Sequence, residues 1–259
     1  MLCAPALIGI FWGAPLITRE LETGTNRLAW TQSITRARWL AVKLALAGLA
    51  SMATAGLFSL MVTWWSSPID RVSMNSLAPA TFDARGITPV GYAVFAFALG
   101  VTAGALIRRT LPAMAVTLAI FAAIQGYAMP QLVRPHLIPP AHASTALDIA
   151  TLISVGSQNG QLIMSGPANI PGAWIYSSEI TLPSGQPVST KPSGACGNRD
   201  SSFNACQNYI ASLHLRQQVT YQPASRYWAL QWAETGVFLA AALLLACSCS
   251  WWVRRSSTA

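Results

Sequence analysis

Long stretches with almost no charged residues constrain this chain more than any other feature of its sequence. Leu40–Trp65 and Tyr227–Val253 each contain a single charged side chain, whereas Pro89–Ile107 and Ala113–Met129 contain none. A helix needs an apolar run of about 20 residues to cross a bilayer. Charged residues make up 9% of the whole chain, against roughly 25% in an ordinary soluble domain, so a soluble fold could not cover its surface.

These runs predict an all-α polytopic membrane protein with about five transmembrane helices. The shorter apolar segment Met1–Ile17 supplies the first helix, and the four longer runs supply the others. Helices one to four are expected within residues 1–129, and the last helix with its tail within residues 227–259. Residues 130–226 are polar and rich in Pro, Gly and Ser, and they predict a small mixed extracellular subdomain.

Three segments of this polar region carry secondary-structure signals. Ala173–Thr181 is rich in strand formers. Pro183–Gln186 has the composition of a turn and favours a hairpin. The spacing of apolar residues predicts a helix over Asn204–Val219.

The distribution of basic residues predicts which ends of the helices face the cytoplasm. Thr18–Lys43, Arg108–Pro112 and the C-terminal tail hold nine Lys or Arg residues in a few dozen positions. The other side holds seven in well over a hundred positions. Because short cytoplasmic loops of membrane proteins concentrate Lys and Arg, the dense side is predicted to be cytoplasmic and residues 130–226 to be outside.

Small residues recur every four positions on two of the predicted helices. Such spacing lets helix backbones approach closely in lipid, so these residues are expected to mark contact faces. They are Ala47, Ser51 and Ala55 on one helix, and Ala96, Gly100 and Gly104 on another.

Cys196 and Cys206 flank a short polar segment of the outer region. An oxidising compartment favours a disulfide between them over two free thiols, and a pair without histidine between its members makes a poor zinc site. Cys3, Cys247 and Cys249 lie in apolar runs and are interpreted as small buried residues.

The chain lacks the motifs of several activities. It has no GxxxxGK[ST] loop for nucleotide binding, and neither HExxH nor GxSxG. Its histidines, His136, His142 and His214, show no metal-ligand spacing. The net charge of +8 is explained by the cytoplasmic loops, and no basic run interleaved with aromatic residues predicts nucleic-acid binding. We therefore predict no catalytic residue, metal ion or cofactor on this chain.

Glu234 is the one acidic residue within a predicted membrane helix. A charge in the membrane is costly and often marks a substrate or proton pathway. Glu234 also follows Arg226 by about two helical turns, which is compatible with a position at the outer interface. The sequence leaves both interpretations open.

A motif at the first predicted loop is more specific. Gly13–Lys43 reads GAPLITRELETGTNRLAWTQSITRARWLAVK, with an acidic pair, a Gly-Thr step, a short helix and a Lys that opens the next span. Gly24 breaks one helix and Thr25 can cap the next. This order resembles the first cytoplasmic loop of type-2 ABC transporter permeases. The resemblance implies a coupling helix that docks into the ATPase subunit, with contacts from Glu20, Glu22, Gly24, Thr25, Arg27 and Arg36.

The other end of the chain carries a second resemblance. Tyr221–Arg255 is similar to the last span of an actinobacterial branch of these permeases, whose members have a long outer loop with cysteines placed like Cys196 and Cys206. The family usually has six spans and this chain offers five. We therefore expect the family's first span to be missing, through a misassigned start or in a truncated paralogue.

The resemblance implies a multi-pass permease subunit of an ABC-type exporter in the plasma membrane. A separate ATPase chain would bind ATP, and a second permease chain, identical or different, would pair with this one in the bilayer. The alternative is a non-transporting scaffold, sensing or immunity protein on the same fold. A polytopic membrane enzyme is disfavoured because few polar residues lie inside the spans.

Overall fold

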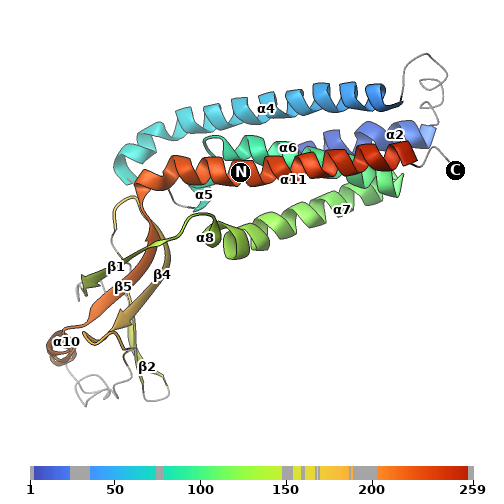
Figure 1. Ribbon diagram of the computed structural model, residues 1–259. Helices are drawn as coiled ribbons and strands as arrows, with labels where there is room; N and C mark the ends of the chain where they lie inside the picture. Colours follow the sequence, from blue (N-terminus) through green and yellow to red (C-terminus); the bar gives the residue numbers. More distant parts are fainter. Residues whose placement is uncertain are drawn as a thin grey trace. The chain divides into compact units, whose positions relative to one another are not determined.

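A computed structural model describes residues 3–23, 36–73, 77, 79–147, 154–158, 161–166, 168, 170–186, 188 and 203–255 (Figure 1). The chain forms two compact units. One consists of Met1–Ile138 together with Ser225–Ala259, and the other of Pro139–Ala224.

The first unit is helical, as its apolar runs predict. A continuous helical segment at its start comprises α1 (Cys3–Ile8), the π-helix η1 (Gly9–Gly13) and α2 (Ala14–Thr23). The remaining elements are α4 (Arg36–Ser73), α5 (Pro79–Phe82), α6 (Thr88–Ile107), α7 (Thr110–Ala123), the π-helix η2 (Ile124–Val133), α8 (Arg134–Leu137), the 3₁₀ turn η4 (Ala224–Arg226) and α11 (Tyr227–Arg255).

Four helical segments are long and apolar enough to cross a membrane, which confirms the polytopic fold class. They are Ala41–Ser67, Thr88–Ile107, Thr110–Leu137 and Ala224–Trp252. The first predicted helix appears as a shorter apolar segment, Ala4–Leu16, and its helical structure continues through α2 to Thr23.

The fourth predicted helix extends further than the sequence analysis placed it. Its predicted end was Met129, but the helix continues through η2 and α8 to Leu137. Pro130 lies inside the π-helical segment η2, whose altered hydrogen-bonding pattern accommodates a residue that has no N–H to donate. Arg134 therefore belongs to the helical unit, and the polar region begins after it.

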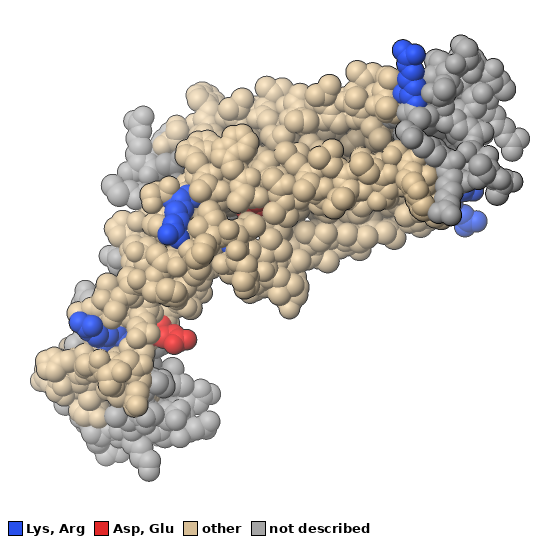
Figure 2. Space-filling model, in the orientation of Figure 1, with Lys and Arg blue, Asp and Glu red and all other residues tan. Residues whose placement is uncertain are grey.

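Helix α6 lies at the centre of this unit. In its apolar stretch 78% of residues are buried, against 22–28% in the other three spans, because α1, α2, α4, α7 and α11 all pack on it. The outer spans instead expose large apolar side chains, as expected for surfaces that face lipid. Figure 2 shows that, on the visible face of the helical unit, Lys and Arg side chains lie near the ends of the helices rather than along them.

The contacts of α6 show that the helices alternate in direction. Gly9 lies against Ala96 and Gly13 against Phe97 and Gly100, so α1 and η1 run parallel to α6. Gly48 faces Phe97 and Gly56 faces Val90, so α4 runs antiparallel to it. The chain thus passes back and forth, as a multi-pass membrane protein must.

Small residues bring α6 unusually close to the helix at the start of the chain. A Cβ atom added to Gly9 would lie 2.7 Å from the carbonyl oxygen of Ala96, and one added to Gly104 would lie 2.8 Å from that of Ala14. The Gly100 Cβ would collide with the carbonyl oxygen of Gly9. The contact face predicted from Ala96, Gly100 and Gly104 is therefore confirmed, as is that of α4, where Ser51 and Ala55 are buried.

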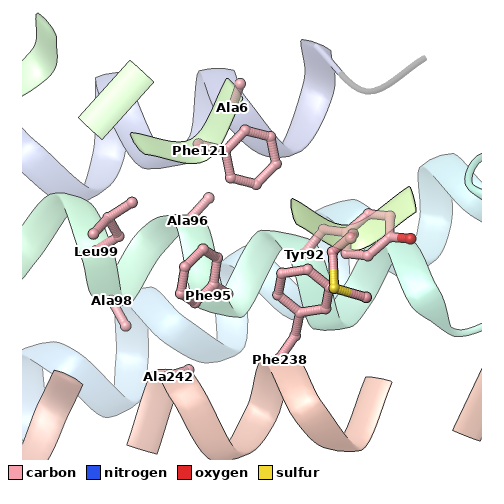
Figure 3. Packing of buried hydrophobic residues seen from close by; sticks show 10 residues of the cluster. Ala6, Tyr92, Phe95, Ala96, Ala98, Leu99, Phe121, Phe238 and Ala242 are labelled. Atoms are coloured by element: carbon pink, nitrogen blue, oxygen red, sulfur yellow. The ribbon is translucent and has the colours of Figure 1, made fainter. Parts of the chain in front are cut away.

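Aromatic residues fill the space between α6 and its neighbours α7 and α11 (Figure 3). The ring of Phe238 meets those of Tyr92 and Phe95 edge-on, at centroid distances of 4.9 and 5.2 Å. Phe121 stacks on Phe95 from α7. Edge-to-face contacts of this kind fix the rotation of each helix about its axis in addition to burying area.

The second unit contains a three-stranded antiparallel sheet in the order β1-β5-β4 and a separate hairpin, β2-β3. Its elements are β1 (Ala141–Ala146), β2 (Ser154–Gln158), β3 (Gln161–Ser165), β4 (Trp174–Thr181), α10 (Phe203–Ser212) and β5 (Arg216–Gln222). The predicted strand at Ala173–Thr181 is confirmed as β4. The predicted turn follows it, with Leu182 and Gly185 joined by a hydrogen bond of 2.8 Å.

The predicted helix over Asn204–Val219 is wrong in its second half. Helix α10 ends at Ser212, and His214 has a positive φ of 45° that turns the chain. The residues that follow form β5, which pairs with β4 on one side and with β1 on the other. Gln217 and Val219, two positions apart, lie on the buried face of this strand. Strand β4 also pairs with β5, and the second arm of the predicted hairpin lies outside the described residues except for Val188.

The glycine contacts of α6 yield a test with a matched control. Replacing Gly100 with Ala should destabilise the helical unit by about 1–3 kcal/mol, because the methyl group meets backbone atoms of Gly9 and Ala14 that cannot rotate away. Gly236→Ala is the control, since nothing lies within 4 Å of its Cβ position. Thermal unfolding in detergent micelles, followed by helical circular dichroism, measures both. Equal midpoints for the two variants would contradict the close packing.

Candidate functional site

Polar contacts gather at the two ends of α6. Glu22, on the last turn of α2, reaches the first residue of α7. The backbone N–H of Thr110 donates to its Oε1 atom at 2.8 Å, and the Thr110 hydroxyl donates to its Oε2 atom at 2.8 Å. The first N–H groups of a helix have no partner within the helix, and a carboxylate there also meets the positive end of the helix dipole. Glu22 therefore caps α7 from another helix.

The environment of Glu22 keeps it ionised. The backbone N–H and the hydroxyl of Thr110, and to a smaller extent Arg109 and Arg19, lower its pKa below the ordinary value. A carboxyl group with a lowered pKa in the folded state stabilises that state above its unfolded pKa, and this stabilisation is lost as the pH falls through the folded pKa. The cap is therefore complete at neutral pH.

The structure describes only part of the predicted coupling segment. Glu20 lies on α2 with Glu22, and Arg36 is the first residue of α4. Gly24, Thr25 and Arg27 lie outside the described residues. The cap on α7 was not anticipated, because nothing in the sequence near Thr110 indicates that an acid from a distant segment reaches it.

The other end of α6 carries a buried cluster of charged residues. Arg134 on α8 and Glu234 on α11 form a bidentate pair, with Nε donating to Oε2 at 3.0 Å and Nη2 donating to Oε1 at 2.7 Å. Arg134 Nη2 also contacts Asp83 Oδ1, and the Arg134 guanidinium lies over the ring of Phe82 at 5.4 Å. The side chain of Glu234 is fully buried and that of Arg134 is 2% exposed.

Tyr92 of α6 joins the two acids of this cluster, which we call the Arg134 cluster: Asp83, Tyr92, Arg134 and Glu234. Its hydroxyl oxygen lies 2.5 Å from Glu234 Oε1 and 3.1 Å from Asp83 Oδ1, so its single proton serves one acceptor at a time. Two carboxylates face one guanidinium, which leaves the cluster with a formal charge of −1 when all three are ionised.

Asp83 is the member of the cluster that lies outside the spans. Its burial raises its pKa above the ordinary value. The nearby Arg134 guanidinium acts in the opposite direction, and the Glu234 carboxylate adds to the increase. The positive charge of Arg134, which also pairs with Glu234, thus balances the negative charge of Asp83 only in part.

Gln231 fastens the segment that leads into α6. Its Oε1 atom accepts hydrogen bonds from the backbone N–H groups of Ile87 and Thr88, at 2.9 and 3.0 Å, and so caps α6 from α11. Its Nε2 atom donates to the carbonyl oxygens of Phe82 and Arg85, both at 3.1 Å. This places Asp83, which lies between those two carbonyls in the chain, beside the Arg134–Glu234 pair.

Glu234 was recognised from the sequence, but its partner Arg134 was not. Arg134 was predicted to lie in the polar region, because residues 130–226 are rich in Pro, Gly and Ser. An isolated acid in an apolar span was itself a signal that a base must lie close, since an unpaired buried charge is prohibitively costly. Within this chain the side chain of Glu234 is fully buried, whereas its depth in the membrane stays as open as the sequence left it.

Only one cysteine of the predicted disulfide lies within the described residues. Cys206, on α10, is disulfide-bonded, whereas Cys196 lies outside the described residues, so their pairing stays a prediction. Cys247 is exposed and Cys249 is buried on α11, and both are free thiols. Within the described residues, no group of three or more His, Cys, Asp or Glu side chains could hold a metal ion.

Comparison with known proteins supports the membrane-protein family that the sequence predicted. The sequence pattern of the family described as "ABC-2 membrane transporter related" matches residues 1–134, about half of the chain. The chain belongs to this family. It is therefore a permease-type component of a membrane transporter, and a multi-pass membrane protein as predicted. No curated protein and no solved structure matches it significantly.

The family match ends at Arg134 and so includes one half of the buried ion pair but not the other. Removing Arg134 alone should destabilise this ABC-2 permease by about 3–5 kcal/mol, because Glu234 is left buried without a counter-charge. Removing Glu234 alone should cost less, since Arg134 keeps Asp83.

A double-mutant cycle in mixed micelles with SDS tests this pair. Arg134→Leu, Glu234→Leu and the double variant are compared by their unfolding midpoints. The double variant should be more stable than Arg134→Leu. Strictly additive effects would show that the two side chains do not interact.

The cap on α7 can be tested separately. Glu22→Ala should speed hydrogen exchange of the amides in the first turn of α7, because Thr110 loses both of its bonds to the carboxylate. Mass spectrometry of exchanged peptides at pH 7 measures this. Glu179→Ala, an exposed acid on β4, is the control. Unchanged exchange around Thr110 would exclude the cap in solution.

Proposed function

We propose that this chain is the membrane-spanning subunit of an ABC exporter, driven by a separate ATPase subunit. The observation that carries this proposal is the connection between the segment before α4 and the helices of the bundle. Glu22 ties the start of that segment to α7, and α2 packs on α6 as well. A force applied to this segment from the cytoplasmic side therefore acts on α6 and α7 directly.

The close contact of α2 with α6 supports such a transmission. Thr18 is fully buried, its hydroxyl donates to the Ala14 carbonyl at 2.8 Å, and the Thr110 hydroxyl lies 3.0 Å from it. Packed interfaces of this density respond to displacement as units rather than by gradual deformation. In the proposed cycle, ATP binds to the partner subunits, and their closure moves the coupling segment together with α2 and the start of α7.

The apolar outer surfaces of the bundle are large enough for a second membrane subunit. Large apolar side chains are exposed along α4, α7 and α11, including Leu57, Leu111 and Leu244. In lipid such surfaces are satisfied either by acyl chains or by another helix. In this proposal two permease chains pair, and the pathway lies between them. No cofactor is assigned to this chain, since ATP is bound by the partner.

The docking can be tested by co-expressing the chain with ABC ATPases of the source genome and measuring co-purification. Arg27→Glu should reduce recovery of the cognate ATPase by about tenfold or more, because a reversed charge in a docking surface produces repulsion. Glu22→Ala should reduce the stimulation of ATP hydrolysis, because Glu22 joins the predicted coupling segment to α7. Glu179→Gln, which lies in the second unit, should affect neither.

Two results would count against this proposal. If no ATPase of the genome co-purifies with the unmodified chain, the non-transporting scaffold interpretation replaces the exporter. If Arg27→Glu is recovered like the unmodified chain, the predicted coupling segment is not the docking surface.

A further inference from the structure

An apolar groove runs along the surface of the helical unit between its first helix and α4. It has a volume of about 340 Å³. Its walls are almost entirely apolar, with Phe11 and Trp12 on η1 and Phe58 on α4 as the largest side chains. Phe11 is 61% exposed and Trp12 is 43% exposed, so the described residues leave this wall uncovered. An alkyl chain matches such walls.

One carboxyl group lies at an end of this groove. Because α1 runs parallel to α6, the residues just before α6 lie beside the beginning of α1, and Asp83 lines the groove there with Ala84 and Pro89. Trp12 lies at the opposite end. The segment from Ala4 to Trp12 spans about 12 Å along the helix axis, at about 1.5 Å per residue.

The carboxyl group of Asp83 has one oxygen available. Its polar contacts within the described chain, with the Tyr92 hydroxyl and with Arg134, both end on its Oδ1 atom. Its side chain is 14% exposed, whereas Arg134 and Glu234 behind it are inaccessible. The Oδ2 atom therefore accepts no hydrogen bond from the described residues, and Asp83 is one of the residues that line the groove.

The charge of the Arg134 cluster determines what charge a ligand next to Asp83 should carry. Arg134 is committed to Glu234 by two hydrogen bonds, so Asp83 shares a cation that is already paired. A cationic ligand would complete the compensation of the two carboxylates. An anionic head group would be repelled by them, and an uncharged one would leave the excess negative charge as it is.

We propose that this groove binds an amphipathic cation: an alkyl chain that lies between α1 and α4 and carries a primary ammonium group bonded to Asp83 Oδ2. An ammonium–carboxylate hydrogen bond at a site with little water is stronger than the same contact in solvent. The aromatic rings of Phe11, Trp12 and Phe58 contact the alkyl chain. This site concerns the membrane unit alone, and it does not depend on the proposed coupling to an ATPase.

The test uses the full chain in nanodiscs of phosphatidylcholine, whose own ammonium group is balanced by its phosphate. The probe is dodecylamine with a photoreactive diazirine near the end of its chain, and the cross-linked peptides are identified by mass spectrometry. Labelling should fall on the peptides that contain Phe11, Trp12 or Phe58. Unlabelled dodecylamine should displace the probe, whereas dodecanol should be at least about tenfold weaker, which corresponds to about 1.4 kcal/mol.

Two variants separate the charge from the apolar wall. Asp83→Asn should reduce labelling about tenfold or more, because the amide keeps the size of the side chain but not its charge. Thr54→Trp should also reduce it, because Thr54 is an exposed residue of the groove wall and a bulkier side chain there narrows the space without touching the cluster. Glu179→Gln should label like the unmodified chain, and thermal unfolding confirms that each variant is folded.

Each remaining outcome would overturn the proposal. Labelling that is equal for Asp83→Asn, or equal competition by dodecanol, would reduce the groove to an unspecific apolar surface. Labelling spread over the outer faces of α7 and α11 would show partition into lipid. Cross-links between two copies of the chain through Phe11 or Trp12, with no displacement by dodecylamine, would show that a second copy fills the groove.

Discussion

The helical unit depends on the direct contact of backbones between α6 and the helix at the start of the chain. Lipid offers no hydrophobic gain when two apolar helices meet, so their association rests on packing and on polar contacts between them. Gly9, Gly13 and Gly100 remove the side chains that would separate the two helices. The other helices then pack on the remaining faces of α6, through Ala47, Ser51 and Ala55 from α4 and through aromatic rings from α7 and α11.

Because the middle of α6 is packed closely against apolar neighbours, its polar contacts with other helices lie at its two ends. At the first end, Gln231 caps α6 from α11, and the Arg134 cluster joins α8, α11 and the segment before α6. At the other end, Glu22 caps the start of α7, next to Arg108, where α6 ends. In both places the capping side chain comes from a different helix. The cap therefore gives the backbone N–H groups their hydrogen-bond partners and also fixes the position of one helix relative to the other.

The sequence predicted correctly those features of the fold that depend on a single segment of the chain. Apolar runs identified the four long spans, and the small residues of α6 and α4 identified their contact faces, because both signals are local. Strand formers located β4 for the same reason. Glu234 was recognised as unusual from its surroundings in the chain. The family was recognised from Gly13–Lys43, where the order of residue types is specific.

What could not be predicted depends on contacts between distant parts of the chain. The helix beyond Met129 contains two prolines and an arginine, and it persists because Arg134 finds Glu234 on another helix. Strand β1, with the sequence AHASTA, has little strand preference and forms because β5 offers it an edge. The second half of the predicted helix at Asn204–Val219 became β5, since pairing on both sides outweighs the local preference.

The position of the ion pair restricts how the permease can move. Arg134 lies on the helix that precedes residues 139–224, and Glu234 lies on the helix that follows them. Two charge-assisted hydrogen bonds therefore join the helix after which the chain leaves the bundle to the helix by which it returns. Separating α8 from α11 would expose an unpaired charge to an apolar environment, which is far more costly than sliding apolar side chains past one another. Movement that starts at α2 is therefore easiest at the end of the bundle where Glu22 lies. There the bonds between Glu22 and Thr110 are exposed to solvent, so α2 and the start of α7 can move together without exposing a buried charge. The two ends of α6 thus differ in how costly it is to move them, and in the proposed cycle α2 and the start of α7 move together while the Arg134 cluster stays in place.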